Sequence, residues 1–134
     1  QIMSTKYSVS VEDFAKGHYI EKIERKYNKK AFDIPWATFG LLLQKIDLLL
    51  QKSTANEITD AKADVVICKI EFKILPKESA KGSGNRCIVA KHVDTGEVKI
   101  LFVYNKSYTP KKQSETVWWK SVIKDNYPEY RDLI

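Results

Sequence analysis

A chain of 134 residues with 43% hydrophobic residues can bury one sizeable core, so we expect a single domain over residues 1–134. Its 23 Lys and Arg against 17 Asp and Glu give a net charge of +6, which favours polyanions such as nucleic acid, although ordinary solubility charge explains the same balance. The longest apolar run, residues 39–43, is far too short to cross a bilayer, and Cys68 and Cys87 suit a reduced, cytoplasmic protein.

The N-terminal part of the sequence changes its period at residue 12. Residues 1–6 look like a disordered or tag-derived start, and residues 7–11 alternate between apolar and polar side chains as a short strand does. From residue 12 to about residue 27 the apolar residues recur at helical intervals. Gly17 lowers the helix propensity there by about 1 kcal/mol relative to Ala, so we expect an irregular start.

A second, more strongly amphipathic helix is predicted over residues 33–50. Asp33 resembles a capping carboxylate and Pro35 a first-turn proline. The apolar stripe that follows has spacings of three and four, which is typical of a helix packed deeply against a sheet. Residues 51–64 are polar and lack a period, so we expect a loop.

Three strands and one helix complete the expected order. The first strand is predicted over residues 65–75, and a basic Gly/Ser loop leads to the second, which Arg86 begins. A turn at residues 94–96 joins the second strand to a third that ends near residue 106. A helix over residues 114–126 ends before Pro128. Segregated helices and consecutive strands indicate an α+β fold, with two N-terminal helices packed on a small antiparallel sheet and a C-terminal helix.

Several kinds of chemical site have no signature in this sequence. The run from Gly82 to Arg86 lacks the length and the lysine of a phosphate-binding P-loop, and no dinucleotide-binding glycine pattern occurs. His18 and His92 do not combine with the cysteines at zinc-site spacing. We therefore expect no cofactor and no metal site.

Cations are concentrated around the predicted strands. Lys69 and Lys73 share one side of the first strand, while Arg86 begins the second and Lys106 ends the third. A sheet could bring these four together, and Arg86 could grip a phosphate with two parallel hydrogen bonds. Further candidates for contact with RNA, by charge or by base stacking, are Lys77, Lys81, Lys111, Lys112 and Trp118. Tyr104, Tyr108 and Trp119 also offer stacking surfaces, although a place in the core suits each aromatic better.

Three segments carry a family resemblance: Lys69-Ile-Glu-Phe-Lys73, Lys81-Gly-Ser-Gly-Asn-Arg86-Cys-Ile-Val, and Gly96-Glu-Val-Lys-Ile-Leu-Phe-Val-Tyr-Asn-Lys106. Together with the order of elements, they resemble the RelE/ParE/HigB superfamily of bacterial toxins. The resemblance implies a RelE-like fold and a toxin that cleaves mRNA at the ribosome without metal, held inactive by a cognate antitoxin protein. The attacking group would be the RNA 2′-hydroxyl.

The resemblance also implies roles for particular residues. Arg86 matches the family's phosphate-binding Arg, Lys69 and Lys73 match its basic strand, and Lys106 matches the basic position after the last strand. One of the two strand lysines would transfer a proton. Tyr108 is a loose match to a C-terminal Tyr, and no His lies where HigB-like members use one. The general acid and base therefore stay unassigned.

Two alternatives remain open at the level of the sequence. A ParE-like toxin would inhibit by binding a topoisomerase and would have no nuclease activity. A basic module could instead bind RNA without cleaving it. The basic strand favours an RNA partner over a topoisomerase.

Overall fold

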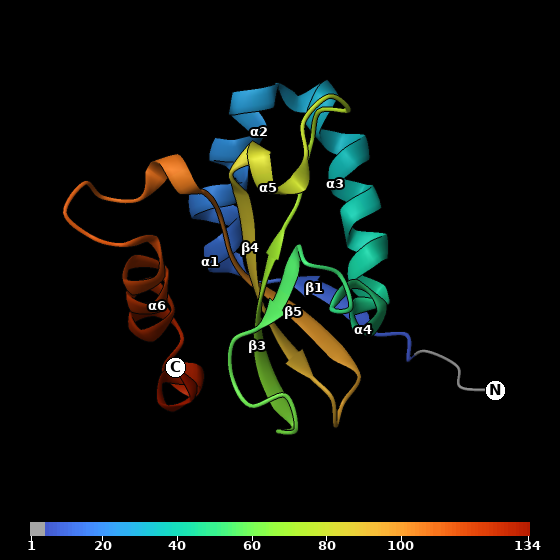
Figure 1. Cartoon of the computed structure of the whole chain (residues 1–134), viewed down its shortest axis with the longest axis vertical. Coiled ribbons are helices and arrows are strands. Elements are labelled where there is room, and N and C mark those ends of the chain that lie inside the picture. Colours follow the sequence, from blue (N-terminus) through green and yellow to red (C-terminus); the bar gives the residue numbers. More distant parts are fainter. Residues whose placement is uncertain (1–4) are drawn as a thin grey trace.

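A computed structural model describes residues 5–134, so residues 1–4 of the expected disordered or tag-derived start at residues 1–6 lie outside the described part. The chain forms an α+β fold with a five-stranded sheet in the order β1-β5-β4-β3-β2 (Figure 1). The strands are β1 (Ser8–Val11), β2 (Ala55–Glu57), β3 (Val65–Glu71), β4 (Asn85–His92) and β5 (Glu97–Asn105). The helices are α1 (Asp13–Ala15), α2 (Glu21–Tyr27), α3 (Lys29–Gln44), α4 (Ile46–Leu49), α5 (Ala80–Ser83) and α6 (Glu115–Asn126).

The sheet is mixed, which corrects the expectation of a purely antiparallel one. The strands β2 to β5 pair antiparallel, but β1 runs parallel to β5, with Ser8 opposite Glu97. Two parallel strands need a long connection between them. Here the N-terminal helices and the strands β2, β3 and β4 lie between β1 and β5 in the sequence and provide it. β1 and β2 therefore form the two edges of the sheet.

The N-terminal helices differ from the prediction in their boundaries. The expected irregularity around Gly17 is confirmed, since a π-helical turn over Lys16–Ile20 separates α1 from α2. The second helix begins at Lys29 rather than at Asp33, because the Asn28 side chain accepts a hydrogen bond from the Ala31 amide. Pro35 consequently lies inside α3. The helix also breaks at Lys45, so the predicted single helix is two, α3 and α4.

Two further boundaries were wrong. The first predicted strand stops at Glu71, since the backbone amides of Ile74 and Leu75 donate to the Glu78 carboxylate instead of to a neighbouring strand. The expected loop at residues 51–64 contains the short edge strand β2, whose Ala55 is buried. The cysteines are free and buried, which agrees with the expectation of reduced thiols.

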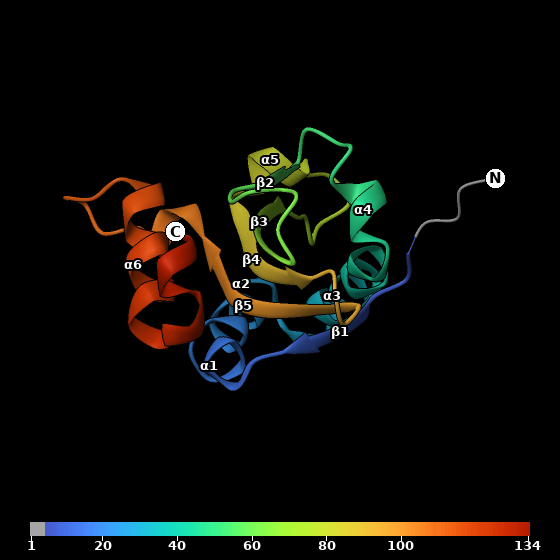
Figure 2. The ribbon, with the colours of Figure 1, turned by 90° about the horizontal axis from the view of Figure 1, so that it is seen from below.

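Helices cover both faces of the sheet (Figure 2). One face packs against α2, α3 and α4, and its core includes Ile23, Phe39, Leu43 and Cys68. The other face packs against α6, and its core includes Ile88, Phe102, Trp119 and Ile123. Within residues 5–134, no helix has the length and apolar character needed to cross a membrane. The central strands therefore present one row of side chains to α6 and the opposite row to α3.

Candidate functional site

Strand register places three polar side chains side by side beneath α6. Glu71 of β3 lies opposite Arg86 of β4, and Arg86 lies opposite Tyr104 of β5. Side chains of directly opposed residues point to the same face of a sheet, so all three face α6. Lys69 occupies the same face one step along β3, because residues two apart on a strand share a side.

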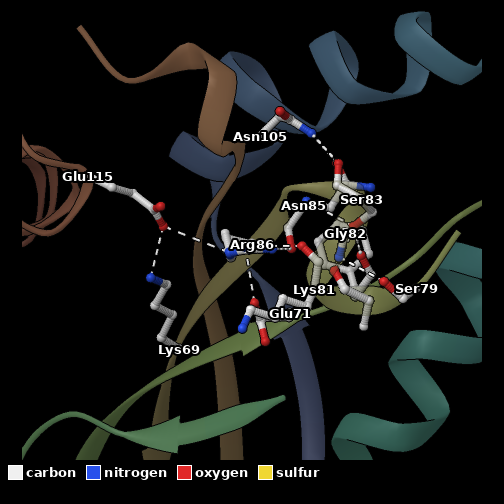
Figure 3. A network of polar contacts seen from close by, with 12 residues as sticks. Lys69, Glu71, Ser79, Lys81, Gly82, Ser83, Asn85, Arg86, Asn105 and Glu115 are labelled. Carbon is white, nitrogen blue, oxygen red and sulfur yellow. Dashed lines mark hydrogen bonds and ion pairs between the residues drawn. The ribbon is translucent and has the colours of Figure 1, made fainter. Parts of the chain in front are cut away.

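A single carboxylate oxygen receives the donors of this group. Glu115, in the first turn of α6, has its Oε2 atom 2.8 Å from Lys69 Nζ and 3.8 Å from Arg86 Nε. The Tyr104 hydroxyl donates to the same oxygen at 2.7 Å. Figure 3 shows Lys69 and Arg86 reaching Glu115 from the sheet. We call Lys69, Glu71, Arg86, Tyr104 and Glu115 the Arg86 cluster.

Arg86 is held rigidly within the cluster. Its side chain is only 6% exposed, and Nη2 lies 3.0 Å from the Glu71 carboxylate. The guanidinium also donates to the backbone carbonyls of Asn85, at 3.0 Å, and Lys81, at 3.3 Å. These contacts fix the orientation of the guanidinium while Nε faces Glu115.

The loop that supplies these carbonyls is itself fixed by a polar network (Figure 3). Asn105 donates to the Ser83 carbonyl and to the Asn85 side chain, at 3.0 and 2.9 Å. Gly84 has a φ of +79°, and a Cβ there would lie 3.1 Å from the Asn105 amide, so a larger residue would be strained and crowded. Glycine at position 84 therefore lets the loop pack closely against Asn105.

The cluster shifts the ionisation of two of its members. Burial raises the pKa of the Glu115 carboxyl, but the hydrogen bonds from Lys69 and Tyr104 and the nearby cations lower it more, so it lies below its usual value. Burial, and then the contact with Glu115, raises the pKa of the Tyr104 hydroxyl far above its usual value. At neutral pH Glu115 is therefore an anion and Tyr104 a hydrogen-bond donor.

The arrangement suits an oxyanion. Three donors from three adjacent strands converge on one oxygen: Lys69 and Tyr104 at the distances that charge-assisted hydrogen bonds to phosphate also take, and Arg86 at the longer distance of an ion pair. The Glu115 carboxylate occupies the place that such an anion would need. With Glu115 present the cluster has two cations and two carboxylates, and an excess of positive charge arises only when Glu115 is withdrawn.

The structure brings together only two of the five residues expected to be catalytic. Lys69 and Arg86 meet at Glu115, as described. Lys73 lines a hollow beside α3 instead, because β3 ends before it. Lys106 is exposed beside Gly84, and the Tyr108 ring lies 4.0 Å beneath Lys22 Nζ.

The expected RNA-binding residues lie on two loops and on α6. Lys77 is exposed on the segment between β3 and β4 and Lys81 is exposed on the short helix α5 in that segment, while Lys111 and Lys112 are exposed on the loop before α6. Trp118 is half-buried and packs edge-on against Phe102. None of these five residues contacts Glu115 among the contacts that the structure describes.

Sequence reasoning missed Glu115, Tyr104 and Glu71 as members of the site. Glu115 carries no signal in the sequence, since an acid in a first helical turn is common. The sequence predicts Tyr104 as a stacking or core residue. It is fully buried, and its hydroxyl belongs to the Arg86 cluster. A β-bulge between Ile88 and Val89 places Tyr104 opposite Arg86, and regular counting from the hairpin would have placed Val103 there.

Comparisons with known proteins leave the chain without an assigned family, since no family model, curated protein or solved structure matches it. Over residues 5–134, no three His, Cys, Asp or Glu side chains gather closely enough to hold a metal ion.

Proposed function

We propose that this chain is a RelE-like toxin, a metal-independent endoribonuclease that cleaves mRNA at the ribosome in the cytoplasm and is restrained by a cognate antitoxin. The proposal combines the resemblance in the sequence with one observation, the convergence of Lys69, Arg86 and Tyr104 on a single anionic oxygen. In this proposal the phosphodiester takes the place of the Glu115 carboxylate.

Each donor has a distinct part in that reaction. As the 2′-hydroxyl attacks, negative charge grows on the phosphorane oxygens, and donors already in position stabilise it without reorganisation. Arg86 is already oriented by Glu71 and by two carbonyls. Lys69 adds a mobile charge, and Tyr104 keeps its proton because its pKa is raised.

The position of the Arg86 cluster also suits a long polyanion. The exposed lysines of the two neighbouring loops, Lys81 and Lys111 among them, could contact phosphates on either side of the scissile one. Contacts of this kind position RNA without reading its sequence. Lys73 has no part in the reaction as we propose it, since it lines a hollow on the α3 side.

Cleavage of RNA by the purified chain tests the proposal. The wild type should cut mRNA bound to purified ribosomes and leave 2′,3′-cyclic phosphate ends. Lys69→Gln should slow cleavage roughly 100-fold, the loss that follows removal of one donor from an oxyanion site. Arg86→Gln should slow cleavage by a similar factor, after the rate is corrected for the fraction of the protein that circular dichroism shows to be folded. Lys62→Gln, an exposed lysine in a distant loop, and Lys73→Gln should stay within about twofold of wild type.

Inducible expression in bacteria tests the same proposal in cells. Growth arrest with newly mapped mRNA 5′ ends should occur with wild type and vanish with Lys69→Gln. If growth arrest persists with Lys69→Gln and the mRNA stays intact, the proposal is contradicted. Topoisomerase-dependent DNA breaks in the arrested cells would identify the ParE-like alternative. RNA binding without cleavage would identify the non-catalytic module.

A further inference from the structure

Large apolar side chains are exposed along α3 and α4. Ile34 is 76% exposed, Leu41 63%, Leu42 47% and Leu48 45%. Single exposed apolar residues are ordinary, but four along two consecutive helices form a patch of the kind that marks an interaction surface. The patch is not needed to cover the sheet, because Phe39, Leu43 and Ile46 of the same helices already do so.

Two adjoining hollows lie along this patch. The larger has a volume of about 600 Å³ and lies between α3 and the chain after β3, with Ile34, Phe39, Leu42, Phe72 and Ile74 in its walls. The smaller, of about 290 Å³, lies among side chains of α3 and α4. Both are lined by Leu42, Leu49 and Lys52, so they form one continuous surface. We call this surface the α3 groove.

The rim of the α3 groove is basic. Lys52 and Lys73 line the larger hollow, and Lys45 lines the smaller one with Lys52. No ion pair among residues 5–134 involves any of the three. The only carboxylate in the walls belongs to Glu71, which already pairs with Arg86 at 3.0 Å. An apolar floor and an unpaired cationic rim together select a ligand that is apolar on one side and acidic on the other.

We propose that the α3 groove binds an acidic, amphipathic peptide segment of a partner protein. Its apolar side chains would fill the hollows, and its carboxylates would pair with Lys45, Lys52 and Lys73, as in helix-in-groove recognition. The inference does not depend on the chain being a nuclease.

Other occupants fit the groove less well. A second copy of the chain would bring the same three lysines against each other on a molecule of net charge +6, which opposes self-association. An anionic membrane would satisfy the charge, but a bilayer surface lies flat and leaves a hollow of about 600 Å³ unfilled.

A synthetic peptide provides a direct test. The probe is a fluorescein-labelled peptide of about 18 residues, with Leu at positions i, i+3, i+4 and i+7 of each repeat and Glu on the other face. Its fluorescence anisotropy should saturate with the full chain. A scrambled peptide of the same composition should bind at least about tenfold more weakly, since it has no apolar face.

Paired variants locate the binding. Leu42→Glu and Lys52→Glu, both at exposed positions of the groove, should each weaken binding at least about tenfold. Val117→Glu on α6, where Val117 is 60% exposed, and Lys62→Glu are the matched controls and should stay within about twofold.

Three results would overturn the inference: no saturable binding of the peptide, an equal loss in the control variants, or equal binding of the scramble. A fourth would be Leu42-dependent binding to phosphatidylserine vesicles without peptide binding, which would identify the groove as a membrane surface. Loss of RNA cleavage by Lys69→Gln together with intact peptide binding would leave the groove proposal standing on its own.

Discussion

Two ion-pair clusters lie on opposite faces of the same sheet and differ in their charge balance. In the Arg86 cluster, beneath α6, two cations meet two carboxylates. On the α4 side, Lys91 Nζ lies 3.0 Å from Asp47 and 3.6 Å from Glu57, and the Tyr7 hydroxyl donates to Asp47. We call these four residues the Lys91 cluster.

The difference between the clusters indicates what each can do. The Lys91 cluster has one cation for two carboxylates, so it repels anions, and its ion pairs tie α4 and the edge strand β2 to β4. The Arg86 cluster loses its balance when one helix withdraws one carboxylate, and it then presents two cations and a hydroxyl donor. A polar cluster on a sheet is thus a candidate anion site when withdrawal of the covering helix's acid leaves more cations than carboxylates.

The largest contrast concerns stability. Lys91→Met should lower the free energy of unfolding by about 2 kcal/mol, because it leaves two carboxylates near each other with no cation. The Lys91 side chain is 7% exposed, but its partners are 39% and 32% exposed, which keeps the loss below that of a fully buried pair. Lys69→Met should cost less than about 1 kcal/mol, since Arg86 still faces Glu115. Urea denaturation measures both, and equal losses would contradict the contrast.

The next contrast concerns anion affinity and rests on the proposed function. Glu115→Gln removes the charge that an entering phosphate would meet, so inorganic phosphate should bind about tenfold more tightly by calorimetry. Asp47→Asn, the matched change in the Lys91 cluster, should leave phosphate binding unchanged. RNA cleavage by Glu115→Gln should be retained or increased. Abolished cleavage with phosphate binding intact would instead make Glu115 the general base.

The smallest contrast concerns pH. The pKa of Glu115 lies below its usual value of 4.5, so its contribution to stability is present above pH 4.5 and is lost as the pH falls through the lower, folded value. Burial lowers the pKa of Lys91, but Asp47 raises it more, to above 10.5, so its contribution is present below pH 10.5 and is lost at higher pH.

Thermal denaturation against pH measures both limits. Glu115→Gln should remove part of the fall in Tm below pH 4.5, and Lys91→Met should remove part of the fall above pH 10.5. If Glu115→Gln changed the fall in Tm above pH 10.5, or Lys91→Met changed the fall below pH 4.5, the assignment of that pH limit to that residue would be wrong.

Local pattern was enough for most of the elements and for two of the five residues of the Arg86 cluster. The alternation around Lys69 and Glu71 placed both on one side of β3, and Arg86 at the start of β4 followed from the loop before it. The contact between Lys69 and Glu115 could not be predicted, because it depends on how α6 docks across the sheet. Helix docking is decided by packing among side chains distant in sequence, such as Trp118 of α6 edge-on against Phe102 of β5.

Errors at the element ends have a common physical origin. Asp33 and Asn28 are both good capping residues, and the backbone of Asn28, with a φ of +62°, decided between them. Lys73 continued an alternating pattern that Glu78 interrupts by accepting the amides of Ile74 and Leu75. In both places a single side chain competed with a regular pattern for backbone hydrogen bonds.

The parallel pairing of β1 with β5 has a consequence for the order of folding. Ser8 pairs with Glu97, which is 89 positions away (97 − 8 = 89), so the first strand to leave a ribosome must wait for the last. The meander from β3 to β5 closes over much shorter loops and can assemble first, because loop closure costs less when fewer residues intervene. The edge formed by β1 and the segment leading into α1 are therefore expected to join last, and a nascent chain shorter than about 100 residues lacks the strand on which its own N-terminus is meant to fold.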